Sequence, residues 1–227
     1  ILNTPNNPTG TVYTAEELKE IAEIAVKNNI FIISDEIYEK LIYEGSHVSI
    51  ASLGKDIKKL TIVINGMSKA YAMTGWRIGY LAAEKEIAKI ITNVQSHATS
   101  NPNTIAQYAS IEAIKGDQEP IEEMVRAFDE RRKYMVERIN QIDNLSCLMP
   151  KGAFYVMVNI SKLIGKNIDG NQINGSMDLA EYLLDTAKVA VIPGAGFGVD
   201  NYVRLSYANS LENIKEGLER IENAIMK

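Results

Sequence analysis

Cysteine and histidine are scarce in this chain of 227 residues. It has one cysteine, Cys147, and two histidines, His47 and His97. A single cysteine excludes a disulfide within the chain and any metal site built from several thiolates. Two histidines are too few for most zinc sites. We therefore predict no bound metal, and we expect a protein of a reducing compartment, the cytoplasm.

Long apolar runs and an excess of positive charge are also lacking. No apolar run approaches the ~18 residues of a membrane span, and no signal peptide is visible. Lys and Arg number 24 against 29 Asp and Glu, a formal net charge of −5. This balance argues against nucleic acid or an anionic membrane as the main partner. The hydrophobic fraction of 46% is ordinary for a globular protein, so the chain can bury a core.

An initiator methionine is missing as well. The chain begins Ile1-Leu2-Asn3, and its first two residues look like the end of a strand cut short. We expect a chain that lacks the N-terminal part of its fold. A processed natural N-terminus is the alternative.

The first half of the sequence has the pattern of an α/β domain. Thr14-Ala-Glu-Glu17 is a capping-box signature for a helix, and the β-branched and aromatic run 30–33 predicts a buried strand of a parallel sheet. This strand–helix–strand order favours the α/β class. Further strands are expected at 60–64 and 78–83, and helices at 84–94 and 104–115.

The second half changes pattern after a long charged amphipathic segment. Residues 120–142 predict one long helix, on which Arg131-Arg132-Lys133 is expected to be a solvated face. Strands are predicted at 145–149, 153–158, 189–192 and 202–207, and helices at 177–187 and from Ser210 to Met226. We expect three parts: a large domain in 1–119, a connecting helix in 120–142, and a small α+β domain in 143–227.

One lysine stands in an unusual place, in the stretch 65–80. Lys69 follows the strand predicted at 60–64, and Arg77 comes eight positions later. Burying an ammonium group is unfavourable unless it is paired or deprotonated. A deprotonated lysine amine can form a Schiff base. We therefore hypothesise that Lys69 carries pyridoxal phosphate.

Other polar residues also follow predicted strands or stand in loops. Asn7 lies in a proline-rich loop, and Asp35 and Tyr38 follow the strand at 30–33, where α/β sheets bind ligands. A plain turn for Asn7, and an acid at a helix N-terminus for Asp35, are the alternatives. His47 lies in the polar segment 44–59 and is expected to be an ordinary solvated or capping histidine. The glycine-rich loop 194–198 does not have the spacing of a dinucleotide-binding loop.

Six ordered motifs together resemble one family. The chain is similar to the fold-type-I pyridoxal-phosphate enzymes, specifically the class I/II aminotransferases of the aspartate aminotransferase superfamily. The matching motifs are Asn6-Asn7-Pro8-Thr9-Gly10, Asp35-Glu36-Ile37-Tyr38, Ser68-Lys69, Gly75-Trp76-Arg77-Ile78-Gly79-Tyr80, Gly152-Ala153-Phe154-Tyr155 and Arg204-Leu205-Ser206. The resemblance implies a mostly parallel three-layer cofactor domain, present in part in 1–119, and a small C-terminal domain.

The resemblance assigns roles around the cofactor ring. Lys69 would form the Schiff base with pyridoxal 5′-phosphate and then move the substrate's proton as general base and acid. Asp35 would pair with the pyridine nitrogen and favour its protonated form. Asn7 and Tyr38 would hydrogen-bond the phenolic oxygen.

The resemblance also assigns the anion sites. Ser68 and Arg77 would bind the cofactor phosphate, which suits the fork of an arginine. Arg204 would hold the substrate α-carboxylate, and Asn7 would also contact the substrate. No metal is implied.

The chain departs from the family pattern in two ways. Gly66 stands where many relatives have a second phosphate-binding serine, so that hydrogen bond is lost or the Gly66 backbone supplies it. The family's phosphate loop, its ring-stacking aromatic residue and the tyrosine lent by a partner subunit would all precede residue 1. We expect the fragment to be inactive alone and the full-length protein to be a homodimer.

Three functions stay open at this point. The leading hypothesis is exchange of an amino group between an amino acid and a 2-oxo acid. A pyridoxal-phosphate-dependent carbon–sulfur lyase of the same superfamily would use the same lysine. An aminotransferase-like effector domain of a transcription regulator would bind ligand without turnover.

Overall fold

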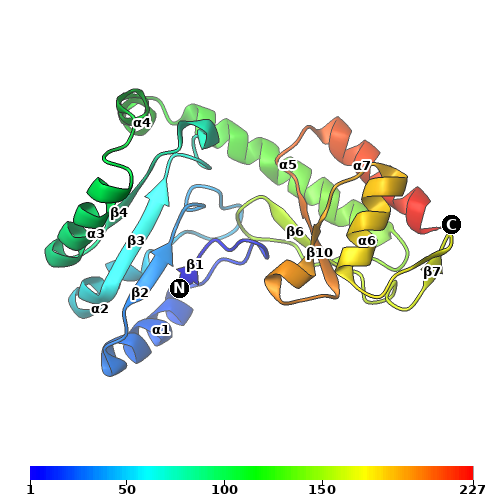
Figure 1. Cartoon of the computed structure of the whole chain (residues 1–227), viewed down its shortest axis with the longest axis horizontal. Helices are drawn as coiled ribbons and strands as arrows, with labels where there is room; N and C mark the ends of the chain where they lie inside the picture. The colour runs from blue at the N-terminus through cyan, green and yellow to red at the C-terminus, as the bar shows by residue number, and fades with distance from the viewer. Residues whose placement is uncertain (227) are drawn as a thin grey trace. The chain divides into compact units, whose positions relative to one another are not determined.

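The computed structural model describes residues 1–226 and divides into two compact units. The first comprises Ile1–Asn7, Thr11–Val125 and Lys151–Ala153. The second comprises Pro8–Gly10, Arg126–Pro150 and the residues from Phe154 onward. Figure 1 shows the elements of both, and each unit is described by itself.

The first unit is built on a four-stranded sheet. Its strands are β1 (Leu2–Asn3), β2 (Ile32–Asp35), β3 (Thr61–Gly66) and β4 (Gly79–Ala82), in the order β1-β2-β3-β4. The first three strands are parallel, and β4 runs antiparallel to β3. The predicted α/β class with a mostly parallel sheet is confirmed.

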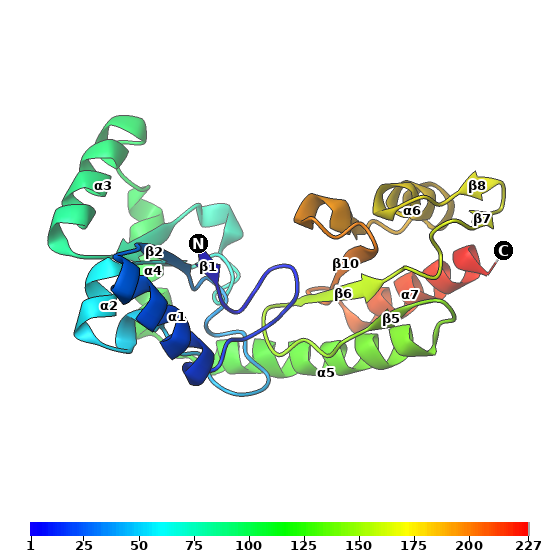
Figure 2. The same cartoon turned by 90° about the horizontal axis from the view of Figure 1, so that it is seen from below.

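Helices α1 (Ala15–Asn28) and α2 (Lys55–Leu60) cover one face of this sheet (Figure 2). Thr14 and Glu17 form the predicted capping box, in which each side chain accepts a hydrogen bond from the other's backbone N–H. The core beneath them is apolar and consists of Leu18, Ala22, Ala25, Ile32, Ile50 and Ile57. The 3₁₀ turn Ile50–Ser52 lies in the polar segment 44–59, before α2.

The other face of the sheet is only partly covered, which corrects the prediction of a fully buried strand. Ile33 of β2 is 38% exposed and Ile64 of β3 is 40% exposed. Helix α3 (Lys85–Ala98) lies over this face and has no buried residue, and α4 (Thr104–Lys115) follows it. A cavity of about 1400 Å³ lies between β3, β4 and these two helices. An apolar run in the sequence predicts a strand that is buried on both faces of its sheet, but here only one face is fully covered.

The second unit has an antiparallel sheet of short strands. They are β5 (Ser146–Cys147), β6 (Tyr155–Asn159), β10 (Tyr202–Ser206) and β9 (Ile192–Pro193), in that order across the sheet. The remaining elements are the β7–β8 hairpin (Asn167–Ile168 and Asn171–Gln172), α6 (Ser176–Tyr182) with its π-helical continuation Leu183–Ala187, the 3₁₀ turn Gly194–Phe197, and α7 (Leu211–Ile225). The strand predicted at 145–149 is thus only two residues long, and the strand predicted at 189–192 is short and displaced toward the C-terminus.

Helix α5 (Glu119–Gln141) matches the long helix predicted at 120–142 and crosses the boundary between the units. The predicted domain limits, 1–119, 120–142 and 143–227, stay a proposal. Among residues 1–226, no helix combines the length and the apolar character needed to cross a membrane.

Arg132 on α5 is buried, so the prediction of a solvated Arg131–Lys133 face is wrong at its centre. The Arg132 side chain is 2% exposed. Its Nη2 lies 2.7 Å from Asp129 Oδ1, and its Nη1 donates to the Pro150 carbonyl. Burial raises the pKa of Asp129, but hydrogen bonds and charges from Lys133 and Arg132 outweigh it and lower that pKa. A guanidinium satisfied in this way tolerates burial.

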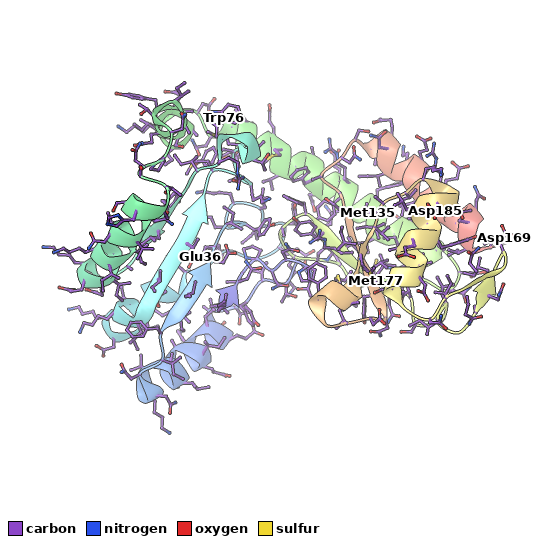
Figure 3. The ribbon with its side chains drawn as sticks, in the orientation of Figure 1. Glu36, Trp76, Met135, Asp169, Met177 and Asp185 are labelled. Carbon is purple, nitrogen blue, oxygen red and sulfur yellow. The ribbon has the colours of Figure 1, made fainter. Side chains whose placement is uncertain are left out.

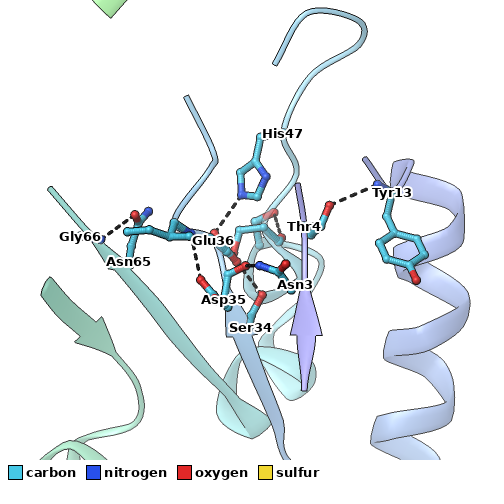
Figure 4. A network of polar contacts seen from close by, with 12 residues as sticks. Asn3, Thr4, Tyr13, Ser34, Asp35, Glu36, His47, Asn65 and Gly66 are labelled. Atoms are coloured by element: carbon cyan, nitrogen blue, oxygen red, sulfur yellow. Dashed lines mark hydrogen bonds and ion pairs between the residues drawn. The ribbon is translucent and has the colours of Figure 1, made fainter. Parts of the chain in front are cut away.

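A buried polar network fixes the carboxyl end of β2. Glu36 is 3% exposed, and its carboxylate accepts hydrogen bonds from Ser34 Oγ at 2.9 Å and Ser49 Oγ at 2.7 Å. His47 Nε2 lies 2.9 Å from Glu36 Oε2. The Glu36 backbone N–H also donates to the Ile64 carbonyl of β3. Figure 3 shows Glu36 in the sheet region of the first unit, and Figure 4 shows the network.

His47 therefore differs from its prediction as a solvated or capping residue. Its side chain is 13% exposed and forms an ion pair or hydrogen bond with Glu36. If Nε2 carries the proton that Glu36 accepts, Nδ1 is left as a bare acceptor, and within residues 1–226 it has no hydrogen-bond partner. The position of His47 in a polar loop did not indicate this contact, because its partner Glu36 lies 11 residues earlier, at the end of a strand.

Glu36 should make the stability of the chain depend on pH. Burial raises the pKa of the Glu36 carboxyl, but hydrogen bonds from His47, Ser49 and Ser34 outweigh it and lower that pKa. A lowered pKa stabilises the fold above the unfolded value of about 4.3, and this contribution is lost as pH falls through the folded value. Glu36→Gln should cost about 1–3 kcal/mol at neutral pH.

The measurement is the free energy of unfolding by urea for both chains, from about pH 7 to about pH 3. The difference between them should shrink as pH falls below about 4.3. Other carboxyls with lowered pKa values, such as Asp129 and Asp200, are present in both chains and cancel. A difference that is constant across this range would contradict the assignment.

Candidate active site

Three parallel strands of the first unit end at one edge of the sheet. Asn3 of β1 pairs with Asp35 of β2, and Asp35 pairs with Ile64 of β3. The predicted site residues Asn7, Asp35 and Lys69 lie at or shortly after these three strand ends. In open α/β sheets this is the edge that binds ligands.

Asn3 joins the Asn7 loop to the end of β2. Its side-chain Nδ2 donates to the Asp35 carbonyl at 3.1 Å, and its Oδ1 accepts from the Asn7 backbone N–H at 2.8 Å. The Thr4 backbone N–H donates to the same Asp35 carbonyl at 3.2 Å. Figure 4 shows Asn3 beside Asp35. Asn3 was not a candidate from the sequence, and only the strand register could have indicated it.

Asp35 is the last residue of β2 and is half-buried. Its Oδ1 accepts a hydrogen bond from the Ile37 backbone N–H at 3.1 Å, which forms an Asx turn and fixes the direction of the carboxylate. Tyr38 follows in the turn and is 4% exposed. The Leu41 N–H donates to the Tyr38 carbonyl at 2.8 Å, so the segment after the strand is tightly turned.

Ser68 and Lys69 lie in a turn directly after β3, and both are half-buried. The turn is closed by the Ala72 N–H on the Lys69 carbonyl at 3.2 Å and by the Tyr71 N–H on the Met67 carbonyl at 3.3 Å. Met67 and Ala70 are buried on either side. Buried neighbours and closed hydrogen bonds hold the Lys69 backbone, while its side chain keeps access to solvent.

Arg77 has a strained backbone. Its φ is +53°, in the left-handed region that residues other than glycine seldom adopt. Its side chain is exposed, and Nη1 donates to the Thr74 carbonyl at 2.8 Å. Strain of this kind is found at functional sites, although seven other described residues, among them Asn29 and Ala72, also have a positive φ. Arg77 lines the 1400 Å³ cavity together with Asn65 and Trp76.

Gly66 and Gly79 face each other across β3 and β4. A Cβ on Gly66 would lie 3.0 Å from the Gly79 Cα, and a Cβ on Gly79 would lie 2.9 Å from the Asn65 carbonyl oxygen. A serine at 66 would therefore crowd this pair. The Gly66 N–H donates to Asn65 Oδ1 at 2.7 Å, so that N–H already has a partner.

The donor set of the first unit fits a phosphorylated pyridine aldehyde. Lys69 brings an amine, Asp35 a carboxylate fixed by its turn, and Ser68 and Arg77 bring a hydroxyl and a guanidinium. These are the groups that such a molecule needs at its aldehyde carbon, its ring nitrogen and its phosphate. All four come from residues 35–77 of one compact unit.

One cluster in residues 1–226 brings together three residues whose side chains can bind metals: Glu36, Glu39 and His47. One ligand atom from each lies within 4.8 Å of the others. Both Glu36 oxygens already accept hydrogen bonds from His47, Ser34 and Ser49. A cation would have to displace these bonds, so we assign no metal to the cluster.

Arg204 belongs to the second unit. It lies in β10, between Met157 of β6 and Ile192 of β9, and it is half-buried. Its guanidinium carbon lies 4.4 Å from the ring centroid of Tyr155 and 5.1 Å from that of Phe197. The predicted cofactor-binding residues thus share the first unit, and the predicted carboxylate anchor lies in the second.

Known proteins are similar to this chain over nearly its whole length. An aspartate aminotransferase of Bacillus sp. (strain YM-2) is 47% identical over 99% of the chain, and one of Geobacillus stearothermophilus is 48% identical over 97%. The crystal structure of the aspartate aminotransferase of Rhizobium meliloti superposes with a TM-score of 0.95 at 41% identity, covering 99% of this chain and 57% of that one.

The relatives are longer than this chain. The chain spans about 57% of the length of the curated relatives it matches. The family model "Aminotransferase class I and II" matches residues 1–221. The chain belongs to the class I and II aminotransferase family.

Proposed function

We propose that the full-length protein, a chain with the length of these relatives, is an aminotransferase that moves an amino group between an amino acid and a 2-oxo acid. The observation that carries this is the placement of Asn7, Asp35 and Lys69 at one carboxyl edge of three parallel strands. The relatives are named aspartate aminotransferases, which favours aspartate as the amino donor.

Bound pyridoxal phosphate would supply an electron sink for the negative charge left at the substrate Cα. The Lys69 amine would take the proton from that carbon as general base, hold it, and then donate it as general acid. The Asp35 carboxylate would hold a proton at the pyridine nitrogen. The Asn7 and Tyr38 side chains would donate hydrogen bonds to the phenolic oxygen.

The remaining site residues would bind anions. Ser68 and Arg77 would hold the phosphate through a hydroxyl and a guanidinium. Arg204 would bind the substrate α-carboxylate with two parallel N–H donors, and Asn7 would contact the substrate beside it. The relatives' names favour transamination over the carbon–sulfur lyase and over the regulator domain. A cytoplasmic location remains our proposal.

Lys69→Ala in the full-length protein should abolish the covalent, borohydride-reducible bond to the cofactor. Alanine has no amine, so no such bond can form at residue 69. Mass spectrometry after borohydride treatment measures the adduct directly. Lys59→Ala is the matched control, because Lys59 is an exposed lysine of α2 and should keep the adduct. An undiminished adduct in Lys69→Ala would refute the assignment.

Arg204→Lys should weaken amino-acid binding more than cofactor binding. Lysine keeps the charge but not the planar fork, so the amino-acid KM should rise roughly 10- to 100-fold while the Kd for pyridoxal phosphate stays within about 2-fold. Steady-state kinetics and cofactor titration give the two values. Arg220→Lys, which changes an exposed arginine paired with Glu216, serves as control. Equal loss of both affinities would count against the role.

The full-length protein should be a homodimer, since the family builds its site with a residue lent by the partner subunit. Sedimentation velocity across a range of concentrations, with activity measured on the same samples, checks this. A fully active monomer at the lowest concentration would show that no partner residue is needed.

A further inference from the structure

The glycine-rich loop 194–198 contacts the Arg204 guanidinium, which the sequence of the loop did not indicate. Phe197 ends the 3₁₀ turn Gly194–Phe197, and its ring centroid lies 5.1 Å from the guanidinium carbon of Arg204. Tyr155 supplies a second ring at 4.4 Å. We call Arg204, Tyr155 and Phe197 the arginine cluster.

The sheet register places Tyr155 beside Arg204. Tyr155 pairs with Ser206 and Met157 pairs with Arg204, so Tyr155 is the diagonal neighbour of Arg204 on the same face. Aromatic and long side chains reach each other across this diagonal. Tyr155 is buried, and its ring also packs on Phe154 with centroids 4.6 Å apart. The Tyr155 ring is therefore fixed.

The loop holds Phe197 by close backbone contact. A Cβ on Gly194 would come within 2.2 Å of the Val199 carbonyl oxygen and 2.4 Å of the Tyr202 carbonyl oxygen, so only glycine fits. The Val199 N–H donates to the Gly194 carbonyl at 3.0 Å, and the Ala195 N–H donates to Ser176 Oγ at 3.0 Å. Ser176 Oγ in turn donates to Asp200 Oδ1 at 2.6 Å.

We infer that Phe197 is a positioning residue, which together with Tyr155 orders the Arg204 guanidinium for in-plane binding of a substrate carboxylate. The inference rests on the proposed role of Arg204 and extends it to the glycine-rich loop. The faces of a guanidinium carry no donors, and its N–H groups all lie in its plane. Contact with two rings limits the rotamers of a long flexible side chain before the carboxylate arrives, which favours binding.

The test substitutes Phe197, which is 36% exposed and can be changed with little effect on the core. The probe is succinate, a carboxylate that cannot transaminate, titrated by calorimetry into the full-length protein loaded with pyridoxal phosphate. Phe197→Leu should raise the succinate Kd by about 3- to 10-fold. Phe197→Tyr keeps the ring and should stay within about 2-fold of the unmodified protein.

Tyr134→Leu is the matched control. It removes a ring that lies 5.5 Å from the Lys215 amine in the same unit, and so a cation–π contact that does not involve Arg204. It should leave the succinate Kd unchanged. A positioning role also predicts a kinetic split, in which Phe197→Leu raises the amino-acid KM and changes kcat by less than about 2-fold.

The Arg204→Lys background separates this inference from the proposed function. Lysine has no planar face to stack, so Phe197→Leu should add less than about 2-fold to the loss already caused by Arg204→Lys. If Arg204→Lys itself leaves succinate binding unchanged, the proposed anchor fails. If Arg204→Lys weakens binding and Phe197→Leu does not, or if Phe197→Tyr and Tyr134→Leu weaken it equally, the positioning role is overturned and the anchor stands.

Discussion

The first unit depends on the hydrogen-bond register of three short parallel strands. Asn3, Asp35 and Ile64 are aligned across β1, β2 and β3, so the chain leaves all three strands at one edge. Each exit is then locked by a local side-chain contact: Asn3 on Asp35, Glu36 on Ser34 and His47, and Asn65 on Gly66. Polar groups that would be orphaned at the strand ends are thereby satisfied. A ligand at this edge would meet side chains whose backbones are already fixed.

Asp35 and Glu36 show how the strand assigns two neighbouring carboxylates to different tasks. Successive side chains at a strand end point to opposite sides. Glu36 is buried and holds three side-chain donors, whereas Asp35 is half-buried and is oriented by one backbone N–H. The Glu36 carboxylate therefore stabilises the fold, whereas the Asp35 carboxylate is oriented for a role in the proposed site. Neither assignment is readable from two adjacent acids in a sequence.

Much of the fold could be predicted because local signals agreed with the tertiary structure. The capping box at Thr14 and Glu17, helix α4 and the long helix α5 all lie within a residue or two of their expected places. Strands β6 and β10 lie close to their predicted places, but the bounds of the two-residue strands β5 and β9 could not be predicted, since two residues carry no periodicity. The site residues could be proposed because their motifs resemble a family. Their supports, Asn3, His47 and Phe197, could not, since only the folded chain brings them beside Asp35, Glu36 and Arg204.

Three arginines show why residue type alone left functions open. Arg132 looked solvated but is buried, because Asp129 and the Pro150 carbonyl satisfy its donors. Arg77 is exposed on a strained backbone, and Arg204 is held against two aromatic rings. A guanidinium whose N–H groups donate to its own protein stabilises the fold. One that is ordered by contacts on its faces keeps an in-plane geometry suited to an anion. Arg132 shows the first arrangement, and Arg204, stacked on the rings of Tyr155 and Phe197, shows the second.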